Sequence, residues 1–96
     1  FDLVFGIGYG DDLLKAKGIL EDIITADDRI AMDPPAIVAV KELGDNSVNL
    51  TALPYVPVEK APEVHFAITE QVKLRFDAEG VSIPFPQRDV HLYQAN

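Results

Sequence analysis

Cysteine is absent from the sequence, which excludes disulfide bonds, thiolate nucleophiles and thiolate metal sites. Basic residues are few, because 8 Lys and Arg stand against 16 Asp and Glu and give a formal net charge of -8. This charge repels phosphate backbones and anionic lipid surfaces, so we expect no nucleic-acid partner. The sequence also lacks an apolar run approaching the ~20 residues that span a bilayer.

The residues that are present fit one small folded domain. Apolar residues make up 48% of the 96 positions and charged residues 25%, the balance of a globular fold with a modest core. The first residue is Phe1 rather than an initiator Met, and an apolar run follows at once. We therefore expect the chain to be a piece of a longer polypeptide.

The first third of the chain predicts a strand followed by a helix. Residues 1–8 are rich in β-branched and aromatic side chains and are closed by glycines, which is typical of a buried strand. Asp11 can cap the helix that follows, and this helix should end near Asp27. Its apolar positions recur at three- and four-residue steps; they are Leu13, Ala16, Leu20, Ile23 and Ile24.

The middle of the chain predicts a β-hairpin. Residues 33–35, Asp-Pro-Pro, break the chain, and residues 37–43 resume as a β-branched run. Residues 44–47 have the composition of a tight turn, and residues 48–53 alternate like a half-buried strand. The two strands should therefore pair antiparallel through a connection of two to five residues.

The pattern then predicts a second helix. Pro62 is well placed in a first helical turn, and Gly80 offers a C-terminal stop. Between them, one apolar face steps by four residues; it consists of Val64, Ile68, Val72 and Phe76.

With a final strand, the predicted order is strand, helix, strand, strand, helix, strand. Right-handed crossovers then place both helices on one face of an antiparallel or mixed sheet. The predicted fold class is α+β, a ferredoxin-like βαββαβ sandwich over residues 1–83 with a C-terminal strand extension. We expect a shared core made of Leu20, Ile23, Val38, Val40, Leu50, Ile68, Val72 and Phe76.

No motif predicts catalysis, a cofactor or a metal ion. Glycines occupy every second position from 6 to 10 before a helix, but they do not fit G-x-G-x-x-G, and Asp11 and Asp12 would repel phosphate. We interpret the glycines as a tight strand-to-helix turn and the aspartates as a helix cap and first-turn charge. His65 and His91 lie on different predicted elements and are interpreted as surface or packing residues. We therefore expect no enzyme.

The C-terminal region combines a stiff spacer with a strand-like tail. Two prolines one residue apart hold an extended path and remove backbone donors, so the segment cannot be the middle of a sheet. The predicted spacer consists of Pro84, Phe85, Pro86 and Gln87. The tail alternates, with Val90 and Leu92 on one side and Asp89, His91 and Tyr93 on the other. It can be a barrel strand that pairs with other chains or an edge strand of the domain's own sheet.

Three segments resemble a known family in their sequence and order. They are residues 8–12 (GYGDD), 33–50 (DPPAIVAVKELGDNSVNL) and 76–87 (FDAEGVSIPFPQ). Together they resemble the C-terminal cytoplasmic region of small-conductance mechanosensitive (MscS) channels over nearly the whole chain. The most specific pieces are the Glu-Leu-Gly-Asp turn at 42–45 and the Ile-Pro-Phe-Pro-Gln run at 83–87.

The resemblance implies a parent channel in a bacterial inner membrane that opens under bilayer tension and releases osmolytes on hypo-osmotic shock. Its transmembrane helices and pore would lie outside these 96 residues, and this segment would be cytoplasmic. The resemblance also implies a homo-heptameric vestibule whose final strands, Asp89–Tyr93 here, assemble into a small barrel. Permeant ions and small osmolytes would pass through it, and no cofactor is implied.

Two other functions stay open on the residues alone. A ferredoxin-like domain can be a small-molecule regulatory module of the amino-acid-binding type, which a thermal-shift panel of amino acids would test. A hydrolase or isomerase would need clustered catalytic groups, and the sequence offers scattered carboxylates. The acidic balance can serve plain solubility, or it can enrich cations along a vestibule wall within a Debye length of ~8 Å.

Overall fold

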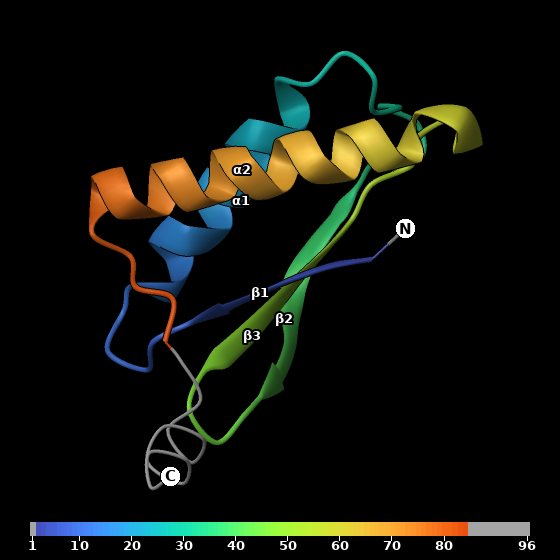
Figure 1. Ribbon diagram of the computed structural model, residues 1–96. Helices are drawn as coiled ribbons and strands as arrows, with labels where there is room; N and C mark the ends of the chain where they lie inside the picture. Colours follow the sequence, from blue (N-terminus) through green and yellow to red (C-terminus); the bar gives the residue numbers. More distant parts are fainter. Residues whose placement is uncertain (1, 85–96) are drawn as a thin grey trace, which may run out of the picture.

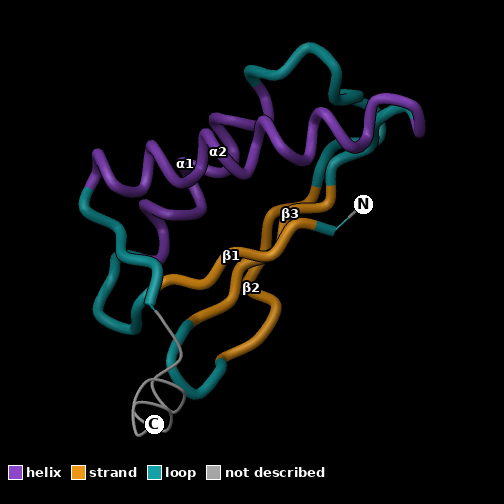
Figure 2. Tube along the Cα trace, in the orientation of Figure 1, coloured by secondary structure: helices purple, strands orange, loops and turns teal. Residues whose placement is uncertain are grey.

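The computed structural model describes residues 2–84. Within them, two helices cover one face of a three-stranded antiparallel sheet (Figures 1 and 2). The elements in chain order are β1 (Leu3–Ile7), α1 (Leu13–Thr25), β2 (Ile37–Leu43), β3 (Val48–Leu53), the 3-10 helix η1 (Val58–Lys60) and α2 (Ala61–Glu79). The α+β class is confirmed, and this arrangement is compatible with a ferredoxin-like domain.

The sheet has the order β1-β3-β2, so β3 is the central strand. Phe5 of β1 lies opposite Leu50, and Val38 of β2 lies opposite Ala52. The predicted hairpin is confirmed, since β2 and β3 pair antiparallel and the Gly44 nitrogen donates to the Ser47 oxygen at 2.8 Å across the turn.

The ends of the helices show why the chain turns where it does. Asp12, rather than the predicted Asp11, is the N-cap of α1, and its carboxylate accepts from the Lys15 nitrogen at 3.1 Å. The prediction for Asp11 was wrong because that side chain is engaged elsewhere in the fold. At the same end of the domain, Gly80 ends α2 in the left-handed region at φ 77°. This conformation suits glycine because it has no Cβ.

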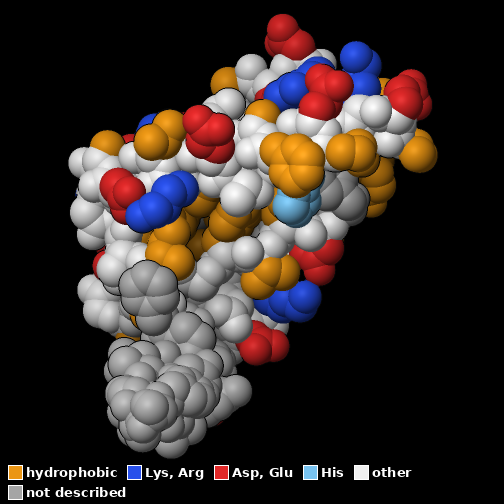
Figure 3. Space-filling model, in the orientation of Figure 1, with side chains coloured by type: hydrophobic (Ala, Val, Ile, Leu, Met, Phe, Trp, Pro, Cys, Tyr) orange, Lys and Arg blue, Asp and Glu red, His pale blue; other side chains and the backbone are white. Residues whose placement is uncertain are grey.

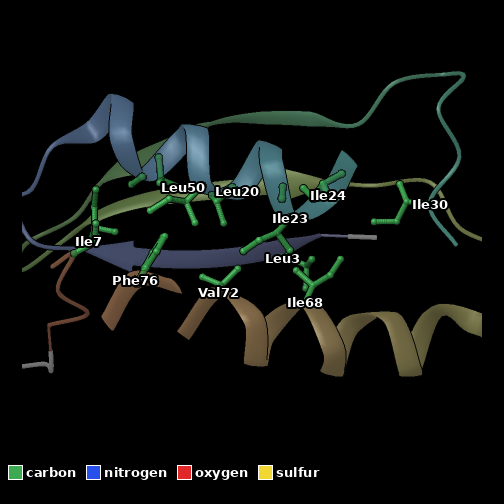
Figure 4. Packing of buried hydrophobic residues seen from close by; sticks show 14 of the residues in the cluster. Leu3, Ile7, Leu20, Ile23, Ile24, Ile30, Leu50, Ile68, Val72 and Phe76 are labelled. Atoms are coloured by element: carbon green, nitrogen blue, oxygen red, sulfur yellow. The ribbon is translucent and has the colours of Figure 1, made fainter. Parts of the chain in front are cut away.

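The core lies between the two helices and the inner face of the sheet (Figure 4). Six of the eight predicted core residues are buried, and they are Leu20, Ile23, Leu50, Ile68, Val72 and Phe76. Val38 is partly buried against this cluster, whereas Val40 is 38% exposed and was wrongly predicted.

The exposure of Val40 follows from the position of β2. This strand is an edge of the sheet, and Leu43, three residues further along it, is 72% exposed. On the face that Val38 and Val40 share, exposure therefore rises toward the hairpin turn, which extends beyond the helices in Figure 1. Alternation alone indicates which face a residue occupies, but not how far the covering layer reaches.

The expected fourth strand is not seen in the part of the chain that the structure describes. Residues 81–84 follow α2 without strand structure. The tail strand Asp89–Tyr93 and the spacer beyond Pro84 lie outside the described residues, so their structural assignment stays a prediction. Among residues 2–84, no helix is long and apolar enough to cross a membrane.

Candidate functional site

Side chains that could hold a metal ion do not gather in the described part of the chain. Residues 2–84 contain no group of three or more His, Asp or Glu side chains that could hold a metal ion. His65 is partly buried with its ring edge-on to Phe66 at a centroid distance of 5.8 Å, which fits the predicted packing role. The distinctive geometry lies instead in the loop that joins β1 to α1.

Asp11 is the centre of that loop. Its Oδ2 atom accepts hydrogen bonds from the Gly8 nitrogen at 2.8 Å, the Ser82 nitrogen at 3.0 Å and the Ser82 hydroxyl at 2.6 Å. The Asp11 nitrogen in turn donates to the Gly8 oxygen at 3.0 Å. One carboxylate therefore closes its own loop and holds a residue that is 71 positions away in the sequence.

The same loop reaches the hairpin through its tyrosine. The Tyr9 hydroxyl donates to the backbone oxygen of Gly44, the first residue of the β2–β3 turn. The loop between β1 and α1 thus touches the hairpin turn with one residue and the segment after α2 with another. Figure 1 shows these three segments together at one end of the domain.

The end of α2 is fixed independently of Asp11. Val81 is 4% exposed, and its nitrogen donates to the Phe76 oxygen at 2.9 Å. The Lys15 ammonium group of α1 donates to the Glu79 oxygen at 2.7 Å, a favourable place for a cation because carbonyls are unpaired at a helix C-terminus. The chain therefore leaves α2 along a defined path as far as Ser82.

Electrostatics supports the ionised form of Asp11. The hydrogen bond from the Ser82 hydroxyl is the main cause that lowers the pKa of Asp11, and backbone donors at Gly8 and Ser82 add to it.

The pKa of Asp27 is lowered chiefly by its hydrogen bond with Arg29, whose own pKa is raised by Asp27 and Glu63. Acidic and basic side chains alternate over the face shown in Figure 3.

Of the predicted site residues, Pro84 is the one that lies within the described part of the chain. Pro84 is partly buried and is the last described residue, while the rest of the spacer and the tail lie outside the described residues. Sequence reasoning missed Asp11, Tyr9 and Ser82 as contact residues. Their segments were quoted as parts of the resemblance, but no local pattern pairs positions so far apart.

Comparison with known proteins identifies the family to which this arrangement belongs. The sequence model of the family described as "Mechanosensitive ion channel MscS, C-terminal" matches residues 1–83. The chain belongs to the MscS family. An uncharacterized MscS family protein of Synechocystis sp. is 41% identical over 93 residues, which are 97% of this chain and 31% of that protein.

Two further MscS proteins agree with this assignment. A small-conductance mechanosensitive channel of Edwardsiella ictaluri is 34% identical over 94 residues, 98% of this chain and 33% of that protein. The crystal structure of Helicobacter pylori MscS in its closed state has a TM-score of 0.83 at 26% identity, and the match covers 94% of this chain and 36% of that one. The chain thus spans about a third of the length of these MscS proteins.

The resemblance found in the sequence is therefore confirmed at the level of the family. The family consists of mechanosensitive channels, a class of membrane-associated proteins and not of enzymes. The matched region is its C-terminal domain. These MscS proteins extend well beyond the part that matches this chain.

Proposed function

We propose that this MscS domain is part of the cytoplasmic vestibule of a tension-gated channel. The parent channel lies in a bacterial inner membrane, releases osmolytes on hypo-osmotic shock and is a homo-heptamer. Permeant ions and small osmolytes pass through the vestibule. In this proposal, residues 1–83 form the wall of the vestibule and residues 84–96 form the spacer and a barrel-type strand.

The observation that carries the proposal is the separation of the two ends of the described part of the chain, residues 2–84. Asp2 precedes β1 at one end of that strand, whereas Ser82 is hydrogen-bonded to Asp11, whose carboxylate also binds the Gly8 nitrogen next to the other end. Figure 1 shows the start of β1 and the last described residues at opposite ends of that strand. A domain that the chain enters at one end and leaves at the other suits a wall placed between a membrane part and a terminal barrel.

The tail would join the subunits through a small apolar face. Val90 and Leu92 share one side of the predicted strand, and burying both contributes only ~3 to 6 kcal/mol per subunit before association entropy is subtracted. The tail alone should therefore assemble weakly. We expect the 96-residue chain to be mainly monomeric in dilute solution, and the membrane part to hold the subunits together.

The test uses the full-length channel in a bacterial host that lacks its own mechanosensitive channels. Patch-clamp recording under applied suction should show tension-activated current, and the host should survive a hypo-osmotic downshift. The double variant Val90→Asp with Leu92→Asp places seven pairs of like charges in one narrow ring. We expect the double variant to lose cross-linking between subunits at the tail, and its current to recover from inactivation at a rate that differs from wild type. The pore should still open.

A single variant, Val58→Asp, serves as the control, because Val58 is 86% exposed and lies in η1, far along the chain from the tail. It should behave as the wild-type channel does. Wild-type membranes without tension-activated current would contradict the channel function itself. Unchanged cross-linking and recovery in the double variant would contradict only the barrel-strand role of the tail.

A further inference from the structure

The segment that follows α2 is hydrogen-bonded to the loop between β1 and α1, which is far from it in the sequence. Residues 8–12 connect β1 to α1, yet the carboxylate of Asp11 binds Ser82 beyond the end of α2. We propose that Asp11 is a positioning residue that fixes the direction in which the C-terminal segment leaves the domain. The role of this direction in the channel rests on the proposed function, but the contact itself does not.

Three donors share one charged acceptor, the Oδ2 atom of Asp11. Hydrogen bonds to an ionised acceptor are stronger than bonds between neutral groups, and here all three end on the same oxygen atom. Two of the donors belong to Ser82, its nitrogen and its hydroxyl group. Both the backbone and the side chain of Ser82 are therefore held, which fixes its orientation as well as its position.

Gly8 leaves the space that this contact needs. A Cβ atom at Gly8 would lie 2.7 Å from the Ser82 hydroxyl oxygen, so that one of the two groups must move, and a tight 3.0 Å from Asp11 Oδ2. A Cβ atom at Gly10, two residues further on, would meet nothing within 4 Å. Gly8→Ala should thus disrupt the contact between Asp11 and Ser82, whereas Gly10→Ala should leave it intact.

The residues on either side of Ser82 are also restricted, so the hydrogen bonds at Ser82 fix the direction of the chain that follows. Val81 is buried before it, and Pro84 follows two residues later with a backbone φ fixed by its ring. With Val81 and Ser82 both held, Ile83 alone separates these two residues from Pro84. Releasing Asp11 would leave Val81 as the last fixed point.

The loop also links this exit to the hairpin turn. Tyr9 donates to the Gly44 oxygen from the same five residues that contain Asp11. A displacement of the loop by the C-terminal segment would therefore reach the hairpin turn through Tyr9. We infer that the exit direction and the hairpin turn are positioned together.

The experiment measures the exit direction in the 96-residue chain itself. Because the sequence has no cysteine, the pair Asn46→Cys and Ile83→Cys can be spin-labelled at two defined places. Both positions are exposed, one in the hairpin turn and one after Ser82. Pulsed electron-electron double resonance gives the distribution of distances between the two labels. Amide hydrogen exchange measures how well the backbone N–H of Ser82 is protected by its hydrogen bond.

Three substitutions are introduced into the labelled chain: Asp11→Asn, Ser82→Ala and Gly8→Ala. We expect each to broaden or shift the distance distribution. Asp11→Asn should also speed exchange of the Ser82 amide roughly ten-fold, the effect of weakening a charge-assisted bond at a partly exposed site. The matched controls are Gly10→Ala and Asp28→Asn, which should leave both measurements at their wild-type values.

A purely structural role would give a different pattern. The variants would then lower the midpoint of urea unfolding while the distance distribution of the folded chain stayed narrow and unshifted. An unchanged distribution in both Asp11→Asn and Gly8→Ala overturns the proposal. Ser82→Ala removes only a hydroxyl group from an exposed residue, so it keeps the test decisive if another variant fails to fold.

The result is independent of channel assembly. Distances are measured within one chain, so a loss of tension-activated current in the full-length protein would not alter them. Conversely, an unaltered distance distribution would remove the positioning role of Asp11 without affecting the channel assay. The two proposals can thus fail separately.

Discussion

Replacing Phe76 by alanine is the sharpest test of how this small domain is held together. Phe76 is 0% exposed and is the largest fully buried side chain among the described residues. Figure 4 shows it pointing from α2 toward β1, in the neighbourhood of Ile7. The substitution would leave a cavity where the second helix meets the sheet.

The free energy of unfolding that Phe76→Ala should remove is large compared with the free energy of unfolding of the whole domain. Truncation of a buried phenylalanine to alanine costs about 3 to 5 kcal/mol, from lost burial and the cavity that remains. A domain of 96 residues has a free energy of unfolding of roughly 5 to 14 kcal/mol at 0.05 to 0.15 kcal/mol per residue. Phe76→Ala should therefore remove at least about a fifth of the free energy of unfolding. Phe76→Leu should remove less because it keeps most of the apolar volume.

The same helix provides the control. Phe66 lies ten residues earlier in α2 and is 70% exposed, so Phe66→Ala should change the free energy of unfolding by no more than about 0.5 kcal/mol. Urea unfolding followed by circular dichroism gives both values by linear extrapolation. If Phe76→Ala cost less than about 1 kcal/mol, or as little as Phe66→Ala, the assignment of the buried face of α2 would be refuted.

Two further predictions concern acid stability and the glycines of the helices. The pKa of Asp11 is below its ordinary value of 3.8 in the folded chain, so its contribution to stability is complete above that value and is lost as the pH falls through the folded pKa. Urea unfolding at a series of pH values should show Asp11→Asn less stable than wild type at pH 7, with the difference vanishing in strong acid; a constant difference would contradict this. Gly18→Ala, inside α1 with open space around the added Cβ, should stabilise the chain by about 0.5 to 1 kcal/mol, whereas Gly80→Ala, at φ 77°, should destabilise it by about 1 to 2 kcal/mol. Thermal unfolding followed by circular dichroism measures both, and effects of the same sign at the two glycines would contradict the assigned ends of the helices.

Periodicity and turn composition were sufficient to predict most of the fold. The three strands and both α-helices in residues 2–84 were expected, whereas the 3-10 helix η1 was not. Both strands of the hairpin begin and end where the sequence pattern places them. These features depend on contacts between residues close in the chain, such as the four-residue steps along α2. Local patterns are reliable where the local interaction decides the structure.

The errors arose where a distant segment decides the outcome. Val40 has the alternation of a core residue, but the helices do not extend over that part of β2. Asp11 has the residue type of a helix cap, but Ser82 and Gly8 bind its carboxylate, and Asp12 caps the helix instead. In both cases the residue type was interpreted correctly for an isolated segment, and the tertiary neighbour changed its role.

The glycines before α1 illustrate the same distinction. Their spacing resembles a phosphate-binding loop, yet the Gly8 nitrogen is already bound by Asp11 Oδ2. Close packing explains two of the three glycines separately, since a Cβ at Gly6 would lie 3.1 Å from Asn49 Oδ1, and one at Gly8 would lie 2.7 Å from the Ser82 hydroxyl oxygen. One glycine therefore serves the outer face of the sheet, and the other serves the exit of the C-terminal segment. The loop holds an acidic side chain where a phosphate loop would hold an anion from solution, so the same backbone donors that could bind a ligand here join two parts of the chain.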